Sequence, residues 1–389
     1  MKKVFLKNYG CQMNDHDSER VKDLLLEYGY CLTDKPDDAD AVIFNTCSVR
    51  KHAEDRVYGA VGNLEGLKKA RPGMVIGIIG CMAEAERDLI FRKLPHVDFL
   101  CGPADLDKIL EIIEKVKSGA GRIMYLEGYK SKRIPEFCKD RRVGKSAYVK
   151  IMEGCSNFCS YCIVPYVRGL ERSRPVEEIL EEIKCLINKG VGEITLLGQN
   201  VNSYGKGLKE KINFVELLKK INRLLGNDIS ISFVTSNPKD AGIDLFKAMR
   251  DLKSVSKNLH LPMQSGSNKI LKIMNRGYTI EKYKKLISDF RRIVKGGSVT
   301  TDIIVGFPGE AEKDFKDTLN AVNEIQFNAA YIFKYSPRPF TKASEFEDDV
   351  RKEEKERRHA VLLEMQRKVS LNYAERNAEL RGSSDLTST

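Results

Sequence analysis

The stretch Glu153–Cys162 reads EGCSNFCSYC and follows directly on a predicted strand over residues 147–152. Its three cysteines are spaced C-x-x-x-C-x-x-C, which lets one loop ligate three of the four irons of a cubane cluster. The next cysteine, Cys185, lies in a predicted helix without a partner motif. The fourth iron would therefore stay open to a ligand that is not protein, as in a catalytic metal site.

Two other interpretations of this loop stay open at this point. A structural zinc site needs four ligands, usually as two pairs, and the sequence has no second C-x-x-C and no histidine pair. Ordinary buried thiols are the second alternative, since free cysteine is often fully buried. The spacing favours a cluster over both.

The cysteine loop belongs to the first of several strand–helix units. Strands are predicted at 147–152, 193–198, 230–234, 257–261, 298–305 and 329–335, with helices between them. Such alternation forms a parallel sheet, and eight units would need a longer chain. This part is therefore predicted as an incomplete (β/α)6 barrel. A charged C-terminal helix follows, and its apolar stripe comprises Leu362, Met365, Val369 and Tyr373.

Residues 1 to about 110 alternate in the same way. Strands are predicted at Lys3–Lys7, Ala41–Phe44, Met74–Ile79 and Val97–Leu100, with helices from about Asp17, from about Ala53 to Lys69, and after Ala83. The fold class is therefore α/β: an N-terminal open parallel-sheet α/β domain, a partial (β/α)6 barrel and a C-terminal helix. The predicted domains are 1–118 (first domain), 119–140 (linker), 141–371 (barrel core) and 372–389 (C-terminal tail).

Three cysteines of the first domain share one position. Cys11, Cys47 and Cys81 each come at, or shortly after, the carboxyl end of a predicted strand. Open α/β sheets bind ligands at that edge, so the three thiolates could converge on a second cluster with one open iron. Cys101 also ends a predicted strand, and from spacing alone burial of free thiols explains the pattern equally well.

Composition restricts the possible partners. The chain has 389 residues, ten cysteines and a formal net charge of +11. It has no apolar stretch near the roughly 20 residues of a membrane span and no signal-peptide core, so we expect a cytoplasmic protein without a membrane partner. In a reducing compartment, cysteines indicate metal binding or catalysis before disulfides. The charge indicates a polyanionic partner such as nucleic acid or, equally, a solvated lysine-rich surface.

The cysteine loop, with an aromatic residue before its last cysteine, resembles the radical S-adenosylmethionine (SAM) superfamily. The resemblance implies that Cys155, Cys159 and Cys162 hold a catalytic 4Fe–4S cluster, whose open iron is chelated by the amino and carboxylate groups of SAM. It implies reductive cleavage of SAM to a 5′-deoxyadenosyl radical. Tyr161 would then lie near the adenine, and Gly192 and Glu193 would lie where the superfamily contacts the methionine amine.

Segments around the strand-end cysteines extend the resemblance. Asn8–Asn14, Asn45–Arg50 and Gly80–Ala83 look like the signature segments of radical SAM methylthiotransferases. Further similar segments are Ile151–Arg168, Leu197–Asn202, Leu261–Ser267 and Thr301–Glu310, so that the likeness covers residues 1 to about 370. The sequences of Tyr9–Asn14 and Gly198–Asn202 resemble those of the MiaB-type branch. That branch converts N6-isopentenyladenosine beside the tRNA anticodon to its 2-methylthio derivative.

The family resemblance implies the cofactors and the reaction. Cys11, Cys47 and Cys81 would hold a second 4Fe–4S cluster, on which one SAM methylates a sulfur, while another SAM yields the radical that activates carbon 2 of adenine. That carbon has no acidic proton, so radical chemistry is the available route, and the cofactors carry it. Implied partners are tRNA, an electron donor such as flavodoxin or ferredoxin, and a sulfur donor.

Further residues are predicted to bind substrate or cofactor. Arg168, Arg172 and Arg174 could contact tRNA phosphates, as could Lys132, Arg133, Arg141 and Arg142 in the linker. Gln264, Asn237 and Glu310 are candidates for the cofactor pocket. For each of these residues a solvated surface or ordinary turn chemistry is the equally good alternative.

Two departures from the family pattern are visible. The family usually ends with a small tRNA-binding β-barrel, the TRAM domain, and we expect it to be missing or truncated here. Phe340 and Lys342 stand where the family commonly has glycine and proline. Two rival functions remain: a methylthiotransferase acting on threonylcarbamoyl-adenosine or on a ribosomal protein, and a non-catalytic iron–sulfur or zinc protein that binds RNA.

Overall fold

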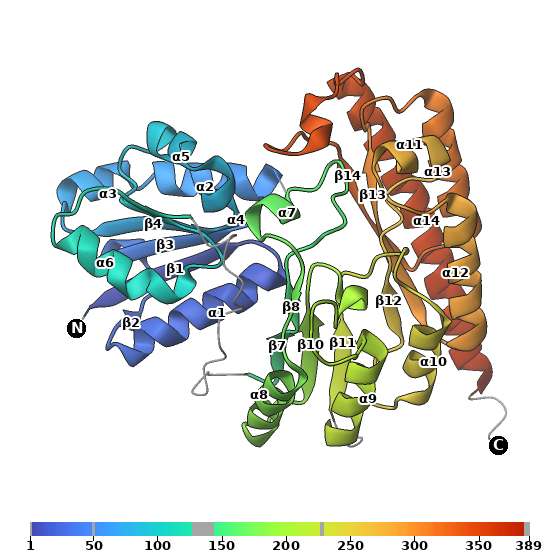
Figure 1. The fold of residues 1–389 in the computed structure, drawn as a ribbon. Coiled ribbons are helices and arrows are strands. Elements are labelled where there is room, and N and C mark those ends of the chain that lie inside the picture. The colour runs from blue at the N-terminus through green and yellow to red at the C-terminus, as the bar shows by residue number, and fades with distance from the viewer. Residues whose placement is uncertain (1, 49–50, 127–143, 226–228, 385–389) are drawn as a thin grey trace.

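The structure is a computed structural model that describes residues 2–48, 51–126, 144–225 and 229–384. It has a first domain built on one sheet and a second domain built as an open barrel, which lie side by side in Figure 1. None of the helices in these described ranges combines the length and apolar character of a membrane span. The second basic stretch predicted from the sequence, Lys132 to Arg142, lies outside the described residues.

The first domain contains a six-stranded, all-parallel sheet with the strand order β2-β1-β3-β4-β5-β6. Its strands are β1 (Lys3–Tyr9), β2 (Cys31–Leu32), β3 (Ala41–Thr46), β4 (Val75–Gly80), β5 (Phe99–Cys101) and β6 (Ile123–Tyr125). The central strands β3 and β4 are buried along their whole length, as their continuous apolar runs predict for a parallel sheet covered on both faces.

Helices cover both faces of this sheet (Figure 1). They are α1 (Gln12–Glu27), α2 (Lys51–Gly62), α3 (Glu65–Ala70), α4 (Cys81–Glu86), α5 (Asp88–Lys93) and α6 (Ile109–Lys117), with short turns η1 (Pro36–Asp38) and η2 (Leu106–Lys108). One apolar core contains Val42, Ile76 and Ile78, and the other contains Ile43, Val75 and Ile79. Alternate residues of β3 and β4 therefore fill opposite cores.

The second domain is the predicted six-stranded open barrel. Its parallel strands are β7 (Ser146–Lys150), β10 (Glu193–Leu197), β11 (Ser230–Phe233), β12 (Asn258–His260), β13 (Ser298–Val305) and β14 (Ala329–Lys334). They form two three-stranded sheets, β11-β10-β7 and β12-β13-β14, and a parallel bridge between Ile231 and Val255 connects the two. A short antiparallel pair, β8 (Met152–Glu153) and β9 (Arg172–Ser173), follows β7.

Helices surround the outside of this barrel, and one apolar core fills the space between them and the strands. They are α8 (Val176–Asn188), α9 (Phe214–Leu225), α10 (Ile243–Asp251), α11 (Asn268–Ile273), α12 (Ile280–Ile293), α13 (Glu312–Ile325) and α14 (Lys352–Ser384), with turns η4 (Val201–Ser203) and η5 (Lys342–Glu345). The short helix α7 (Val164–Val167) instead lies between the two domains. Leu362 and Val369 of the predicted apolar stripe are buried, and Met365 packs against the same core.

Three features differ from the sequence prediction. The single helix expected from about Ala53 to Lys69 is two helices, α2 and α3, which end at Gly62 and Ala70. The strand β6 lies inside the predicted linker and pairs with β5, so the first sheet extends beyond residue 118. The backbone is helical to Ser384, well into the predicted tail. Strand propensity alone could not predict β6, because a strand of three residues is stabilised mainly by pairing with its neighbour, here β5.

Candidate iron–sulfur sites

The strand-end cysteines of the first domain follow one row of paired residues. Tyr9 of β1 is in register with Thr46 of β3, and Thr46 is in register with Gly80 of β4. Cys47 and Cys81 come directly after their strands, and Cys11 comes two residues after its own. Because the strands are parallel and aligned, all three thiols lie at one edge of the sheet, as predicted.

Two buried asparagines fix this edge. Asn14 and Asn45 are fully buried, and the Asn14 Nδ2 donates a hydrogen bond of 2.9 Å to the Asn45 Oδ1. The Asn45 Nδ2 donates in return to the Asn14 backbone oxygen. The loop after β1, which carries Cys11, is thereby tied to the end of β3. Gly80 is required here, because a Cβ on it would lie 2.3 Å from the Asn45 Oδ1.

The three thiols of this set influence one another's ionisation. A hydrogen bond with Cys47, assisted by the charge of Arg168, lowers the pKa of Cys11 to about 6. Burial raises the pKa of Cys81, against the opposing effect of Arg168. Cys11 is exposed, whereas Cys47 and Cys81 are buried. Cluster ligation requires deprotonated thiols, and a thiolate at neutral pH beside a buried cation fits that requirement.

This difference predicts selective alkylation in the cluster-free protein. Iodoacetamide should react first at Cys11, with a rate midpoint near pH 6 rather than the roughly 8.5 of an ordinary thiol. The fully buried Cys101 is the control and should react only on unfolding. Peptide mass spectrometry after short exposure measures both. Equal labelling of Cys11 and Cys101 would contradict the exposure and ionisation described here.

The second set of cysteines lies in the loop after β8. Gly154 has a φ of 80°, and a Cβ there would lie 2.2 Å from the Leu170 backbone oxygen, so only glycine fits. Two side chains donate hydrogen bonds to the sulfurs: Arg276 Nη1 lies 3.2 Å from the Cys159 Sγ, and Asn157 Nδ2 lies 3.5 Å from the Cys155 Sγ. Such hydrogen bonds are typical of iron–sulfur ligation and tune its potential.

The thiols of this second set lie near one another. Burial raises the pKa of Cys155 and raises that of Cys162 to about 12, and the neighbouring Cys159 adds to both shifts. Among the described residues, no group of three or more His, Cys, Asp or Glu side chains is arranged to hold a single metal ion. Three thiols in each set match the number of protein ligands of a 4Fe–4S cluster with one open iron.

A single buried arginine connects the two sets. Arg168 Nε donates to the Cys81 Sγ at 3.3 Å, Nη1 to a Glu153 carboxylate oxygen at 2.9 Å and Nη2 to an Asp17 carboxylate oxygen at 2.7 Å. Glu153 lies two residues before Cys155, whereas Asp17 belongs to helix α1 of the first domain. Arg168 therefore contacts the Cys81 thiol of one cysteine set and Glu153, a sequence neighbour of the other set.

Lys150 completes this buried ion network. Its ammonium lies 3.8 Å from Asp17 and 3.5 Å from Glu153. Burial alone would raise the pKa of Asp17, but Arg168 and Lys150 hold it below its usual value. The carboxylates are therefore ionised in the folded protein and compensate the buried cations.

The predicted RNA contacts of Arg168 and Arg174 are wrong. Both side chains are buried, with relative exposures of 4%, and Arg174 Nη1 donates to a Glu182 carboxylate at 2.6 Å and to the Lys150 backbone oxygen at 2.7 Å. Their charges are compensated inside the protein and cannot reach a phosphate. Arg172 is half-buried beside Glu153, and its contact with RNA stays a prediction.

The position predicted for Gly192 and Glu193 is also wrong. Glu193 is in register with Ser146, the first residue of β7, so both residues lie at the amino ends of the barrel strands. The cysteine loop is at the opposite edge, roughly 17 Å away along a five-residue strand. The residue that reaches the loop from β10 is Gln199, whose Oε1 accepts a hydrogen bond from the Gly154 backbone N–H.

The remaining candidates lie at the cysteine edge of the barrel. Tyr161 packs edge-on against Phe307, with ring centroids 6.5 Å apart. Gln264 has a φ of 69°, and its buried Oε1 makes no hydrogen bond to any described residue. A strained backbone with a free buried oxygen is typical of a ligand site, so its role as a SAM contact stays a prediction with support. Asn237 instead accepts a hydrogen bond from the Lys239 N–H within its own turn.

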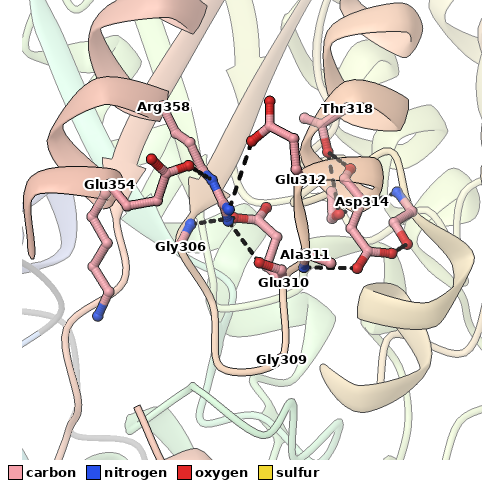
Figure 2. Close-up of polar contacts among 12 residues, drawn as sticks. Gly306, Gly309, Glu310, Ala311, Glu312, Asp314, Thr318, Glu354 and Arg358 are labelled. Atoms are coloured by element: carbon pink, nitrogen blue, oxygen red, sulfur yellow. Dashed lines mark hydrogen bonds and ion pairs between the residues drawn. The ribbon is translucent and has the colours of Figure 1, made fainter. Parts of the chain in front are cut away.

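Glu310 positions the 306–310 loop with one of its carboxylate oxygens. Its Oε2 accepts hydrogen bonds from the Gly306 backbone N–H at 2.5 Å and from Arg358 Nη1 at 2.8 Å (Figure 2). Arg358 belongs to α14 and is also bonded to Glu354. The other oxygen, the buried Oε1, makes no hydrogen bond among the described residues, so the role of Glu310 in the cofactor pocket stays a prediction.

Comparisons with known proteins agree with this arrangement. Residues 149–322 match the model of the radical SAM superfamily, and residues 3–102 match a model described as uncharacterized protein family UPF0004. A tRNA-2-methylthio-N(6)-dimethylallyladenosine synthase of Clostridium novyi is 45% identical over 98% of this chain and 84% of its own length. The chain belongs to this family of synthases. The Acetivibrio thermocellus protein of the same name is 45% identical over 95% of this chain and 77% of its own.

Solved structures support the fold of this radical SAM methylthiotransferase. TsrM, a radical SAM methyltransferase from Kitasatospora setae, superposes with a TM-score of 0.62 at 12% identity, covering 88% of this chain and 75% of TsrM. The cobalamin-dependent SAM radical enzyme OxsB gives a TM-score of 0.55 at 12% identity, covering 92% of this chain and 56% of OxsB. At 12% identity both structures support the fold alone. Membership in the family, with SAM and 4Fe–4S clusters as its cofactors, excludes the zinc alternative.

Sequence reasoning missed several residues of these sites. Asn14 and Asn45 lie inside the segments that resemble the family signatures, and the polar Asn45 at the end of an apolar strand was the available signal, whereas Asn14 lies in helix α1. Asp17, Glu153 and Arg276 gave no local signal, because their partners are far away in the sequence.

Proposed function

We propose that this chain attaches a methylthio group to carbon 2 of N6-isopentenyladenosine beside the anticodon of tRNA. The observation that carries the proposal is that one buried residue, Arg168, contacts Cys81 of the first cysteine set and Glu153, two residues before the second set. The names of the relatives, which match over most of both chains, supply the acceptor nucleoside. Three cysteines per cluster leave one iron of each for SAM or for sulfur.

The residues of the chain have distinct tasks in this proposal. Two bound 4Fe–4S clusters and SAM would supply the radical and the methylthio group. Cys155, Cys159 and Cys162 would hold one cluster, and Cys11, Cys47 and Cys81 the other. Gln264 would offer its free Oε1 to SAM, and Tyr161 would lie near its adenine. Arg276 would hold the Cys159 thiolate, because its guanidinium is buried against that sulfur.

Three further statements belong to the proposal. The electron that starts SAM cleavage would come from a small reducing protein such as flavodoxin or ferredoxin. A separate donor would replace the sulfur used in each turnover. The place of action would be the cytoplasm, where tRNA is modified and thiols stay reduced.

Anaerobic reconstitution followed by assay tests this function. Protein loaded with iron and sulfide should contain about eight irons per chain, from two 4Fe–4S clusters. With a reductant and SAM it should release 5′-deoxyadenosine and convert isopentenylated tRNA to the 2-methylthio product, detected by nucleoside mass spectrometry. Matched tRNAs without the isopentenyl group, or with threonylcarbamoyl-adenosine, are the controls. Preference for the threonylcarbamoyl substrate would transfer the proposal to that branch, and bound zinc without SAM cleavage would overturn it.

A further inference from the structure

Three aromatic rings form a row on the surface beside the cysteines. Phe158 and Phe340 are exposed, with 45% and 55% of their surface accessible, and Tyr166 lies between them. The ring centroids are 6.2 Å apart from Phe158 to Tyr166 and 6.3 Å apart from Tyr166 to Phe340. We call these three residues the aromatic row. Neighbouring exposed large apolar side chains are uncommon unless the surface binds something.

Two members of the aromatic row have a strained backbone. Phe158 has a φ of 46° and Phe340 a φ of 67°, in the left-handed region that costs free energy for a residue with a Cβ. A buried ring could offset that cost by leaving water, but about half of the surface of Phe158 and Phe340 stays exposed. Burial therefore offsets only part of the backbone strain at these two positions. Glycine at position 340 would relieve the strain, because it has no Cβ.

The loops that carry the rings are held in place. Arg338, two residues before Phe340, is bonded to Glu54 of α2 at 2.9 Å in a buried ion pair. The Ala343 N–H donates to the Ser160 backbone oxygen at 2.7 Å, which joins the Phe340 loop to the cysteine loop. Asn275 Nδ2 donates to the Phe158 backbone oxygen at 3.0 Å. The rings are thus presented by a preset frame, which lowers the entropy lost on binding.

The aromatic row extends between the two cysteine sets. Phe158 directly precedes Cys159 in the sequence, and Tyr166 packs against a buried group that contains Cys81. Helix α7, which carries Tyr166, lies between the two domains in Figure 1 and contacts α4. A planar group that stacks on the row would therefore lie next to both sets. Exposed lysines flank the row: Lys342 follows Phe340 by two residues, and Lys239 Nζ lies 3.5 Å from the Asn157 Oδ1.

We propose that the aromatic row is a stacking platform for unpaired bases of the anticodon loop, beside the base that is modified. This inference rests on the proposed function and adds how the loop is recognised. Proteins read single-stranded RNA by stacking unpaired bases on aromatic side chains, and nearby lysines neutralise the phosphates. Flat exposed rings, flanking lysines and a net charge of +11 favour RNA over a protein partner.

Binding of a short RNA tests the platform at Phe340. The probe is an isopentenylated anticodon stem–loop, and a duplex RNA of equal charge is the reference, both titrated into reconstituted protein by fluorescence anisotropy. Phe340→Ala and Phe340→Gly should weaken stem–loop binding about tenfold, the contribution of one stacked base, and leave duplex binding unchanged. Phe340→Tyr should bind as the wild type does. The salt dependence should keep its slope, because no phosphate contact is lost.

The controls separate this inference from folding and from the proposed function. Tyr28→Ala removes a more exposed ring, 69% accessible, from the C-terminal end of α1, and should bind normally. Iron content and melting temperature of Phe340→Gly should match or exceed the wild type, since strain is relieved. Unchanged stem–loop binding by Phe340→Ala would overturn the platform and leave the row to a protein partner. A wild-type protein without preference for the stem–loop over the duplex would instead contradict the proposed function.

Discussion

Replacing Cys11, Cys47 and Cys81 together by alanine is expected to lower the iron content of the reconstituted protein from about eight to about four atoms per chain. Formation of the 2-methylthio nucleoside should fall below detection, while SAM is still cleaved to 5′-deoxyadenosine. The reason is geometric: the three thiols follow one aligned row of strand residues and converge at one sheet edge, apart from the Cys155 loop. Iron analysis and product mass spectrometry on one preparation measure all three quantities.

Cys101→Ala is the matched control for this experiment. Cys101 also ends a strand of the same sheet and is fully buried, and its thiol donates to the backbone oxygen of Gly102 at 3.6 Å. Iron content and product formation should be unchanged in this variant. Replacing Cys155, Cys159 and Cys162 should remove the other cluster: about four irons should remain per chain, and SAM should no longer be cleaved. Full iron content in the first triple variant would refute the second cluster.

The sequence predicted most of the architecture because the deciding signals are local. Continuous apolar runs such as Ala41–Phe44 mark strands buried on both faces, and all six barrel strands were found within a few residues of their ends. Cysteines placed after such runs must share an edge once the strands are parallel. The position of Cys11, Cys47 and Cys81 therefore followed from the strand predictions, whereas Cys101 could not be separated from them by spacing.

The errors arise where a role depends on contacts between distant segments. The charge of Arg168 and Arg174 near a cysteine motif predicts RNA contacts, but both side chains are buried. The role of Arg168 is decided by Asp17, a carboxylate partner 151 positions away in the sequence. The family position predicts that Gly192 and Glu193 contact the methionine amine, but the register of β10 with β7 places them at the opposite strand ends. Neither burial nor register can be read from a local pattern.

Arg168→Met is expected to have the second large effect, a loss of about 3–5 kcal/mol of folding free energy, typical of breaking a buried ion pair. The substitution would take from Asp17 its main cation, would leave Glu153 with Lys150 as its remaining buried cation, and would remove the donor to the Cys81 sulfur. We therefore expect iron to be lost selectively from the Cys11, Cys47 and Cys81 set. Urea unfolding and iron analysis of the reconstituted variant, at matched pH, measure the two effects.

Arg174→Met separates the two effects, because Arg174 forms an equally buried pair with Glu182, and its Nη1 donates to that carboxylate and to the Lys150 backbone oxygen rather than to a cysteine sulfur. It should lose comparable stability and keep about eight irons. Adding Asp17→Asn to Arg168→Met should recover part of the stability, because one unpaired buried charge is removed.

The Asp17 pKa is lowered in the folded state, so its stabilisation is present above its unfolded value of about 3.9 and is lost as the pH falls further. The free energy of unfolding of Arg168→Met should therefore fall less steeply with decreasing pH than that of the wild type. An equally steep fall would show that the Arg168–Asp17 pair does not connect the two domains energetically.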